Sequence, residues 1–298
     1  MAALAERPGP HLLVDTYSLF FRAYHALPEM NTKSGEPTSA LYGFSAVLLK
    51  ELREQRPSGI AFAVDAPQKT FRHERYARYK AQREALPSGL VAQLRRLGEL
   101  LAAFEVPVLC VPGFEADDIL ATLAQRFRRE GTPAVVMSGD RDLLQLAHGG
   151  IRVLFVGARG QKPVMYDAER VRERFGVTPE QLPSWAALVG DTSDNLQGLR
   201  GVGPRTAAKW VQEFGNAEAL LARAAEVQPE RLRRELEAQR ERLLLNQELA
   251  TLRTDVPLAP GPASAPLGSA ALEHLRSLFE VLEFRSLLAR LDALSADR

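Results

Sequence analysis

Short apolar runs alternate with longer segments of helical periodicity through the first half of the chain. Helices are predicted at residues 38–55 and 90–105, where apolar positions recur every three or four residues. Strands are predicted at residues 11–15, 59–66, 106–111, 134–138, 151–157 and 163–167. Strands that alternate with crossover helices are typical of a mostly parallel sheet. We therefore expect residues 1–166 to form an α/β domain with helices flanking a central sheet.

The pattern changes from residue 167 onward. Short helical segments separated by Gly or Pro come first, a long charged helix is predicted at residues 230–253, and a last helix at 269–291. The Pro-rich stretch 256–268 between them reads as an extended crossing segment. We expect residues 167–298 to form a mostly helical domain whose last helix packs back on the body.

Charge is balanced overall but segregated along the chain. The net charge is +1, which alone says nothing about a polyanionic partner. Basic residues nevertheless dominate between Lys69 and Arg96, whereas acids dominate at the strand ends. No segment approaches the roughly 20 apolar residues of a membrane span, and the start lacks a signal-peptide pattern. These features predict no membrane partner and an intracellular, cytoplasmic location.

Acidic residues gather where the predicted strands end. They are Asp15, Asp65, the group Glu115, Asp117 and Asp118, and the pair Asp140 and Asp142. Ligands of an open parallel sheet bind beyond the carboxyl ends of its strands. A fifth group, Asp191 and Asp194, brackets a tight turn in the helical region and is placed to reach the same edge.

Each acidic group taken alone has a structural explanation. Asp65 precedes a turn-like Ala-Pro pair, Asp117 and Asp118 suit the positive end of a helix, and Gly139-Asp140 is an ordinary turn dipeptide. Together, so many carboxylates at one edge would repel one another unless cations were bound. Oxygen ligands without His or Cys favour Mg²⁺ or Mn²⁺, and the number of acids suffices for the two ions of a phosphodiester hydrolase.

A second pattern predicts contact with a nucleic-acid backbone. The run LRGVGPRTA, within residues 196–215, is typical of a helix–hairpin–helix. Gly201, Val202 and Gly203 would form a turn tight enough for backbone N–H groups to meet a phosphate, next to a helix N-terminus that begins with Thr206. Arg205 and Lys209 would add charge without reading bases. The alternative is a plain turn between two helices.

The basic stretch FRHERYARYKAQR interleaves aromatic residues with cations. Tyr76 and Tyr79 in such a segment are expected to stack on bases while the cations neutralise phosphates. A solvated amphipathic helix is the alternative reading. Arg22, just after the first predicted strand, is a further candidate for a phosphate contact.

At this point the chain resembles the 5′-nuclease superfamily, most closely the N-terminal 5′→3′ exonuclease domain of bacterial DNA polymerase I. The resemblance runs from about residue 11 to 291. It is carried by LLVDTYSLFFRAYHAL, GEPTSALYGF, FAVDAPQKTFRHERYARYK, PGFEADDILATLA, SGDRDLLQL, GDTSDNLQGLRGVGPRTA and LEFRSLL. So many motifs in this order are very specific.

The resemblance implies a PIN-like α/β fold with a mostly parallel central sheet and a helical arch at about residues 68–96. By motif, the nine acids named above would bind metal, with Asp117 and Asp118 like the tighter-site ligands and Asp191 and Asp194 like the second-site group. Lys80 matches the arch lysine that assists phosphate charge stabilisation, with Arg72 and Arg83 as helpers. The turn at residues 201–203 resembles a duplex-binding turn whose carbonyls coordinate K⁺.

The implied activity is that of a structure-selective 5′→3′ exonuclease and 5′-flap endonuclease. It would act on duplex DNA with a 5′ end, nick or flap, and on RNA–DNA hybrids, as a monomer in replication and repair. The segment after Arg83 is less acidic and less Pro-rich than the family pattern, so details of threading stay open. A polymerase acting in cis or in trans is an expected partner, and both a free-standing exonuclease and an excised domain fit the sequence.

Two other functions are alternatives to this nuclease activity. A non-catalytic DNA-binding module would keep the hairpin and lose the acids or Lys80, all of which are present. An RNA-cleaving PIN-like nuclease would usually lack the hairpin and the arch. The sequence therefore favours the metal-dependent nuclease.

Overall fold

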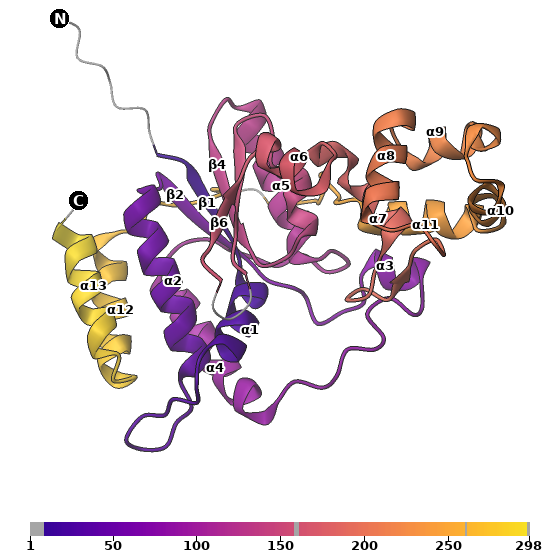
Figure 1. Ribbon diagram of the computed structural model, residues 1–298. Coiled ribbons are helices and arrows are strands. Elements are labelled where there is room, and N and C mark those ends of the chain that lie inside the picture. Colours follow the sequence, from indigo (N-terminus) through magenta and orange to yellow (C-terminus); the bar gives the residue numbers. More distant parts are fainter. Residues whose placement is uncertain (1–8, 158–160, 260, 297–298) are drawn as a thin grey trace, which may run out of the picture.

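A computed structural model describes residues 9–157, 161–259 and 261–296 of the chain. Its centre is a six-stranded sheet in the order β3-β2-β1-β4-β5-β6 (Figure 1). The strands are β1 (His11–Asp15), β2 (Gly59–Ala63), β3 (Val108–Leu109), β4 (Ala134–Ser138), β5 (Ile151–Phe155) and β6 (Val164–Tyr166). The first five are parallel and β6 is antiparallel. The predicted α/β architecture with a mostly parallel sheet is confirmed.

Side chains of the central strand alternate between two hydrophobic cores. On β1, Leu13 belongs to a core that includes α5, while Leu12 and Val14 face a core on the opposite side of the sheet. The prediction of a buried strand over residues 106–111 was too long. Only Val108–Leu109 pairs with β2, and Val108 is exposed.

Helices cover both faces of the sheet (Figure 1). The N-terminal helices are α1 (Thr16–Ala26), α2 (Ser39–Gln55), α3 (Phe71–Arg75), α4 (Ser88–Ala103) and α5 (Ala116–Arg129), and the 3₁₀ helix η1 spans Asp142–Leu146. The last two helices, α12 (Ser269–Val281) and α13 (Arg285–Ala296), pack beside α4 and α2. The prediction that the chain's end packs back on the body is confirmed.

The remaining helices form a region to one side of the sheet (Figure 1). They are α6 (Ala168–Phe175), η2 (Pro179–Gln181), α7 (Leu182–Val189), α8 (Pro204–Phe214), α9 (Ala217–Ala222), η3 (Ala224–Glu226), α10 (Glu230–Ala238) and α11 (Arg240–Ala250). Their apolar side chains join the core on the α5 face of the sheet. The acidic edge and the helical region are therefore held by one continuous core.

Two long helices predicted from periodicity are each broken in the structure. The segment 230–253 divides into α10 and α11 at Gln239, and the final segment divides between Val281 and Arg285. The second break contains Glu283 in the left-handed region, at φ 58°. Periodicity continues across such breaks because both halves bury their apolar faces in the same core.

Two predicted DNA-binding elements differ in detail from expectation. The predicted arch, residues 68–96, is helical only in α3 and from Ser88, where α4 already packs into the core; residues 76–87 are turns and extended chain. The predicted hairpin is longer than expected, because a two-stranded ribbon separates α7 from α8. That ribbon pairs β7 (Gly190–Asp191) with β8 (Leu196–Gln197).

Candidate metal centre and DNA-binding surfaces

A pocket of about 710 Å³ opens at the carboxyl ends of the parallel strands. Five of its acids come from four strands or the segments that follow them, namely Asp15, Asp65, Glu115, Asp117 and Asp140, and a sixth, Glu84, comes from the segment after Arg83. Strands β1 and β4 are neighbours although their sequence positions are far apart, so the crevice lies where the strand order reverses. The structure thus brings together five of the nine predicted metal-binding acids.

Local hydrogen bonds fix the orientation of two of these carboxylates. Asp15 is the N-cap of α1: its Oδ1 accepts from the Ser18 backbone N–H at 3.2 Å, and its Oδ2 accepts from the Ser138 hydroxyl at 2.5 Å. Asp65 Oδ1 accepts from the Ala116 N–H at 2.8 Å, at the start of α5. These contacts lock β1, β2 and β4 to a common edge.

The acids in the pocket destabilise one another's charge. Burial, opposed by the Ser138 hydrogen bond and reinforced by Asp65 and Asp140, raises the pKa of Asp15 to about 7. Burial and the charges of Asp15 and Asp140 also raise the pKa of Asp117 well above its usual range. Raised pKa values at converging carboxylates are typical of a site that is stabilised by bound cations.

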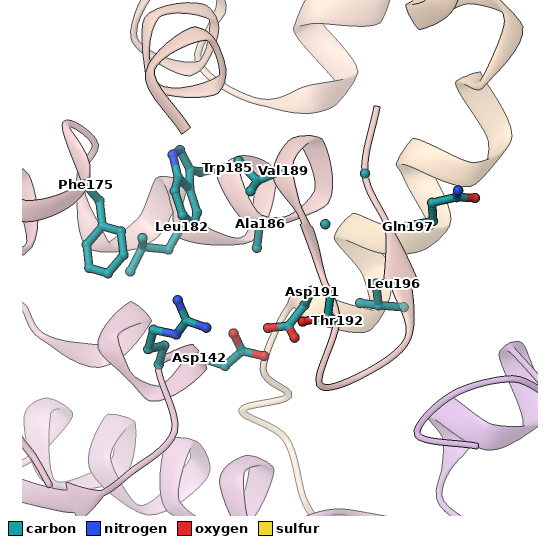
Figure 2. Close-up of a pocket in the computed structure, with 13 residues that line it drawn as sticks. Asp142, Phe175, Leu182, Trp185, Ala186, Val189, Asp191, Thr192, Leu196 and Gln197 are labelled. Carbon is teal, nitrogen blue, oxygen red and sulfur yellow. The ribbon is translucent and has the colours of Figure 1, made fainter. Parts of the chain in front are cut away.

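Two further acids face each other in an adjacent pocket of about 400 Å³. Figure 2 shows Asp142 from η1 and Asp191 from β7 directed toward the same space, below Leu182 and Trp185. Burial, together with the charges of Asp140, Asp194 and Asp191, raises the pKa of Asp142 well above its usual range. The two acidic pockets are therefore electrostatically linked.

The carboxylate oxygens of the main pocket are ligands that suit hard divalent ions, but in this structure they do not surround one common ion position. Among the residues described, no group of three or more acidic, His or Cys side chains surrounds a position where a single ion could be held. The Lys80 side chain occupies part of the main pocket, where its Nζ lies 3.1 Å from both Glu115 oxygens. The carboxylates fit a metal centre chemically, and metal binding would require Lys80 and neighbouring side chains to move.

Tyr79 contacts this acidic centre, contrary to the prediction that it stacks on bases. Its side chain is buried, and its hydroxyl lies 2.8 Å from Asp194 Oδ2 and 3.1 Å from Glu115 Oε2. Burial and the two carboxylates raise the pKa of Tyr79, so the hydroxyl keeps its proton. Tyr76 is half-buried and packs against the same small cluster. The buried Tyr79 ring therefore presents no free face for stacking.

The roles predicted for Arg72 in catalysis and for Asp118 in metal binding stay predictions, and the structure places both side chains outside the main pocket. The two side chains are buried and form a bidentate pair at 2.6 and 2.9 Å. Neither lines the pocket at the strand ends. Asp118 also accepts from the Arg253 and Glu115 backbone N–H groups, at 2.9 and 3.2 Å, so its oxygens are already used. The pair joins α3 to the first turn of α5 on the interior side of the main pocket.

The segment around Lys80 is docked on the turn between β7 and β8. Lys80 N donates to the Asp194 carbonyl, Gln82 Nε2 donates to the Thr192 carbonyl, and Asn195 Nδ2 donates to the Arg78 carbonyl, at 3.2, 2.7 and 2.8 Å respectively. Lys80 itself adopts a left-handed backbone, at φ 53°. The hairpin thereby fixes where the Lys80 side chain enters the pocket.

Two predicted cations lie at the edges of the main pocket. Arg83 Nη2 lies 3.3 Å from Asp194 Oδ1, and its side chain is exposed at the pocket's mouth. Arg22 lines the same pocket and donates to the Gly139 carbonyl beside Asp140. Both are placed where a phosphate entering the pocket would meet them.

The predicted hairpin turn precedes α8. Gly201 is in the left-handed region, at φ 84°, which favours glycine there. Val202 is buried in the core, whereas Gly203 is exposed and caps α8 without a side chain. Arg205 and Lys209 are exposed on the first turns of α8, and Thr206 is half-buried. These positions leave the backbone of the turn and two cations open to a ligand.

Sequence reasoning missed residues that complete the pockets. Ser18 and Ser138 orient Asp15, and the spacing of Ser18 three residues after a capping Asp was a usable signal. Tyr17 and Phe21 line the main pocket and stack on each other, with ring centres 5.8 Å apart. Their spacing of four residues on a helix would have placed them on one face.

Comparison with known proteins identifies both halves of the chain. Residues 10–176 match the model of the 5′-3′ exonuclease N-terminal resolvase-like domain, and residues 177–272 match the 5′-3′ exonuclease C-terminal SAM fold. DNA polymerase I of Mycobacterium bovis is 42% identical over 98% of this chain, and thermostable DNA polymerase I of Thermus thermophilus is 40% identical over 99%. The chain spans about a third of the length of these relatives, 32% and 35% respectively.

Solved structures of the same fold include a phage exonuclease and the catalytic core of Rad2. A T5 5′-exonuclease structure aligns with a TM-score of 0.65 at 22% identity, covering 97% of both chains. The catalytic core of Rad2 in complex with DNA aligns with a TM-score of 0.62 at 19% identity, covering 96% of this chain and 92% of that one. Since its first family model alone covers more than half of its length and the expected motifs lie at one sheet edge, the chain belongs to the 5′-3′ exonuclease family.

Proposed function

We propose that this chain is a divalent-metal-dependent nuclease that removes nucleotides from DNA 5′ ends and cuts 5′ flaps during replication and repair. One observation carries the proposal: Asp15, Asp117 and Asp140 converge from separate strands in a pocket that also contains Lys80 and Arg83. Converging acids that bound cations would stabilise, beside the positive charges of Lys80 and Arg83, suit hydrolysis of a phosphodiester.

Two Mg²⁺ or Mn²⁺ ions are proposed as cofactors. Asp15, Asp117 and Asp140, with Glu115, would hold one ion, and Asp142 with Asp191 would contribute to the second. The bound ions would supply an activated water and neutralise charge on the phosphate. The similar T5 5′-exonuclease is described with zinc bound, and a related T5 flap endonuclease with DNA and metal ions. K⁺ at the turn of residues 201–203 stays a prediction.

The chain's own residues would bind and orient the scissile phosphate. Burial opposes charge on Lys80, but Glu115 and Asp194 raise its pKa, so its ammonium group stays charged. Once the phosphate competes for it, Lys80 would leave Glu115 and donate to a phosphate oxygen. Arg83, exposed at the mouth, and Arg22, beside Asp140, would hold flanking phosphates.

Duplex DNA with a 5′ end, nick or flap is the proposed substrate, with an RNA–DNA hybrid as a related one. The 40–42% identity to DNA polymerases I supports a polymerase partner in cis or in trans. A non-catalytic DNA-binding module is the competing function. The presence of all five acids in one pocket favours the enzyme over that module.

A 5′-flap duplex, labelled to follow the products of both strands, tests the proposal in Mg²⁺ and in EDTA. Cutting near the junction should require Mg²⁺, and Asp117→Asn should reduce it by about 10³-fold or more, since it removes a ligand of the metal centre. Glu237→Gln, which removes an exposed carboxylate on α10, is the matched control and should cut normally. Tight binding without cutting in Mg²⁺ or Mn²⁺ would establish the non-catalytic module instead.

A further inference from the structure

A groove of about 340 Å³ lies between the end of α6 and the start of α8, outside the acidic pockets. Of the residues that the structure describes, three cationic side chains and no acidic one line it. Its lining consists of Arg174, Phe175, Gly176, Trp185, Pro204, Arg205, Ala208, Lys209 and Gln212. The sequence pointed to the two cations of α8, but Arg174 comes from a helix outside the hairpin.

The two walls of the groove are held close together. Gly176 ends α6 in the left-handed region, at φ 73°, and a Cβ built there would lie 3.2 Å from the Ala208 Cβ. Gln212 Nε2 donates to the Gly176 carbonyl, and Trp185 Nε1 donates to the Pro204 carbonyl at 3.1 Å. The groove is therefore a fixed feature between packed helices.

The guanidinium of Arg174 is held in place by aromatic rings. It lies over Phe175, Tyr166 and Phe155, 5.2, 5.5 and 5.7 Å from their ring centres, and donates to the Tyr166 hydroxyl. Such packing reduces the entropy that an arginine loses when it binds an anion.

Among the described residues, no salt bridge involves the three cations of the groove, Arg174, Arg205 and Lys209. Several other arginines of the helical region do pair with acids, as in Arg223–Glu226 and Arg234–Glu230. Gly203 is the N-cap of α8 and has no side chain, so the N–H groups of Arg205 and Thr206 in the first turn of this 11-residue helix have no side-chain cap. Clustered cations beside uncapped N–H groups would be stabilised by a phosphate.

We propose that this groove binds a backbone phosphate of double-stranded DNA, with Arg174 as a ligand from outside the hairpin. The inference rests on the proposed DNA substrate. The groove shares Phe175 and Trp185 with the pocket of Asp142 and Asp191, so a strand held there continues toward the acids. A duplex suits the groove better than a single strand, because a duplex carries twice the density of phosphate charge along its axis for the three cations to meet.

Fluorescence anisotropy in EDTA tests the groove without cleavage. Arg174→Met keeps an apolar stem against the rings and removes the charge. It should raise the Kd for a 5′-labelled duplex about tenfold and reduce the slope of log Kd against log salt by about 1. Arg174→Lys should keep the wild-type slope. Arg172→Met, on the same exposed end of α6 but outside the groove, is the matched control and should bind normally.

Gln212→Glu probes the same groove if Arg174→Met fails to fold. It places a negative charge among the three cations and leaves the rings around Arg174 unchanged, although it also removes the amide that donates to the Gly176 carbonyl. It should weaken duplex binding about tenfold. Unchanged Kd and salt slope in both variants, or an equal loss of affinity for a single strand of the same length, would overturn the proposal. Because binding is measured without metal, this outcome is separate from a failure to cut flaps.

Discussion

The Arg72 guanidinium and the Asp118 carboxylate form a fully buried bidentate pair, 2.6 and 2.9 Å apart. Arg72 Nε also donates to the Leu249 carbonyl at 2.8 Å, and Asp118 accepts from the Arg253 N–H. Three separate parts of the chain, α3, α5 and the end of α11, thus meet at one ion pair. The acids at the start of α5 and the segment that carries Lys80 take their relative positions from it.

Replacing one partner of this pair should destabilise the whole protein. Asp118→Ala leaves a buried guanidinium without its carboxylate, which costs about 3–5 kcal/mol in the free energy of unfolding. Urea unfolding measures this loss in EDTA. Arg72→Met combined with Asp118→Leu removes both charges and should recover part of the stability. An Asp118→Ala protein of normal stability that only loses Mg²⁺ binding would restore Asp118 as a metal ligand.

Tyr79→Phe should weaken the docking of the Lys80 segment. The variant removes the buried hydroxyl between Glu115 and Asp194, at a cost of about 1–2 kcal/mol. Thermal melting in EDTA measures the loss, and flap cutting should slow because Lys80 is less well placed. Tyr76→Phe is the matched control for a half-buried tyrosine in the same segment. Equal stability and selectively weaker binding of single-stranded DNA would instead support base stacking by Tyr79.

The convergence of the acids was predictable because parallel strands end at one edge. Asp15 and Asp140 follow adjacent strands, and the register of β1 with β4 brings them into one pocket. The role of each individual acid was less predictable. Asp117 and Asp118 are neighbours in sequence, but one faces the pocket and the other the interior, because successive helix positions are about 100° apart.

Residues that act through contacts distant in sequence left no local signal. Arg72 reads as one of several cations in a basic stretch, and only the fold reveals that it donates to the Leu249 carbonyl and pairs with Asp118. Arg174 likewise has no motif of its own. The groove that it lines exists because α6 and α8 pack together, which hydrophobic periodicity alone does not specify.

The stability of the metal-free protein should depend on the protonation of Asp15. Its pKa of about 7 exceeds the ordinary value of 3.8, so the folded protein retains a proton that the unfolded chain releases. The contribution of Asp15 is therefore most favourable below about pH 4 and is lost as the pH rises to about 7. Asp15→Asn should show a growing advantage in melting temperature over the wild type across this range in EDTA.

Mg²⁺ should reverse that advantage at alkaline pH, because the ion stabilises the ionised carboxylate that Asn cannot supply. Melting curves at pH 5, 6, 7 and 8 test both expectations: those in EDTA test the growing advantage of Asp15→Asn, and those in Mg²⁺ test its reversal. Ser295→Ala, far away on α13, controls for general effects of pH. A constant difference between wild type and Asp15→Asn across the range would show that Asp15 is ionised throughout.

Lys80→Met should slow cleavage while leaving duplex affinity nearly unchanged. The ammonium group lies inside the acidic pocket, 3.1 Å from Glu115, whereas the cations proposed to bind duplex DNA lie on α6 and α8. Loss of one charge that stabilises a developing phosphate charge reduces the rate by about 10²–10³-fold. Single-turnover cutting of a 5′-flap duplex measures the rate, and anisotropy in EDTA measures the affinity.

Arg78→Met, an exposed cation two residues earlier, should change neither by more than about twofold, since surface charges away from the pocket contribute little. If Lys80→Met instead weakened binding and left the single-turnover rate intact, Lys80 would be a backbone contact rather than a catalytic residue.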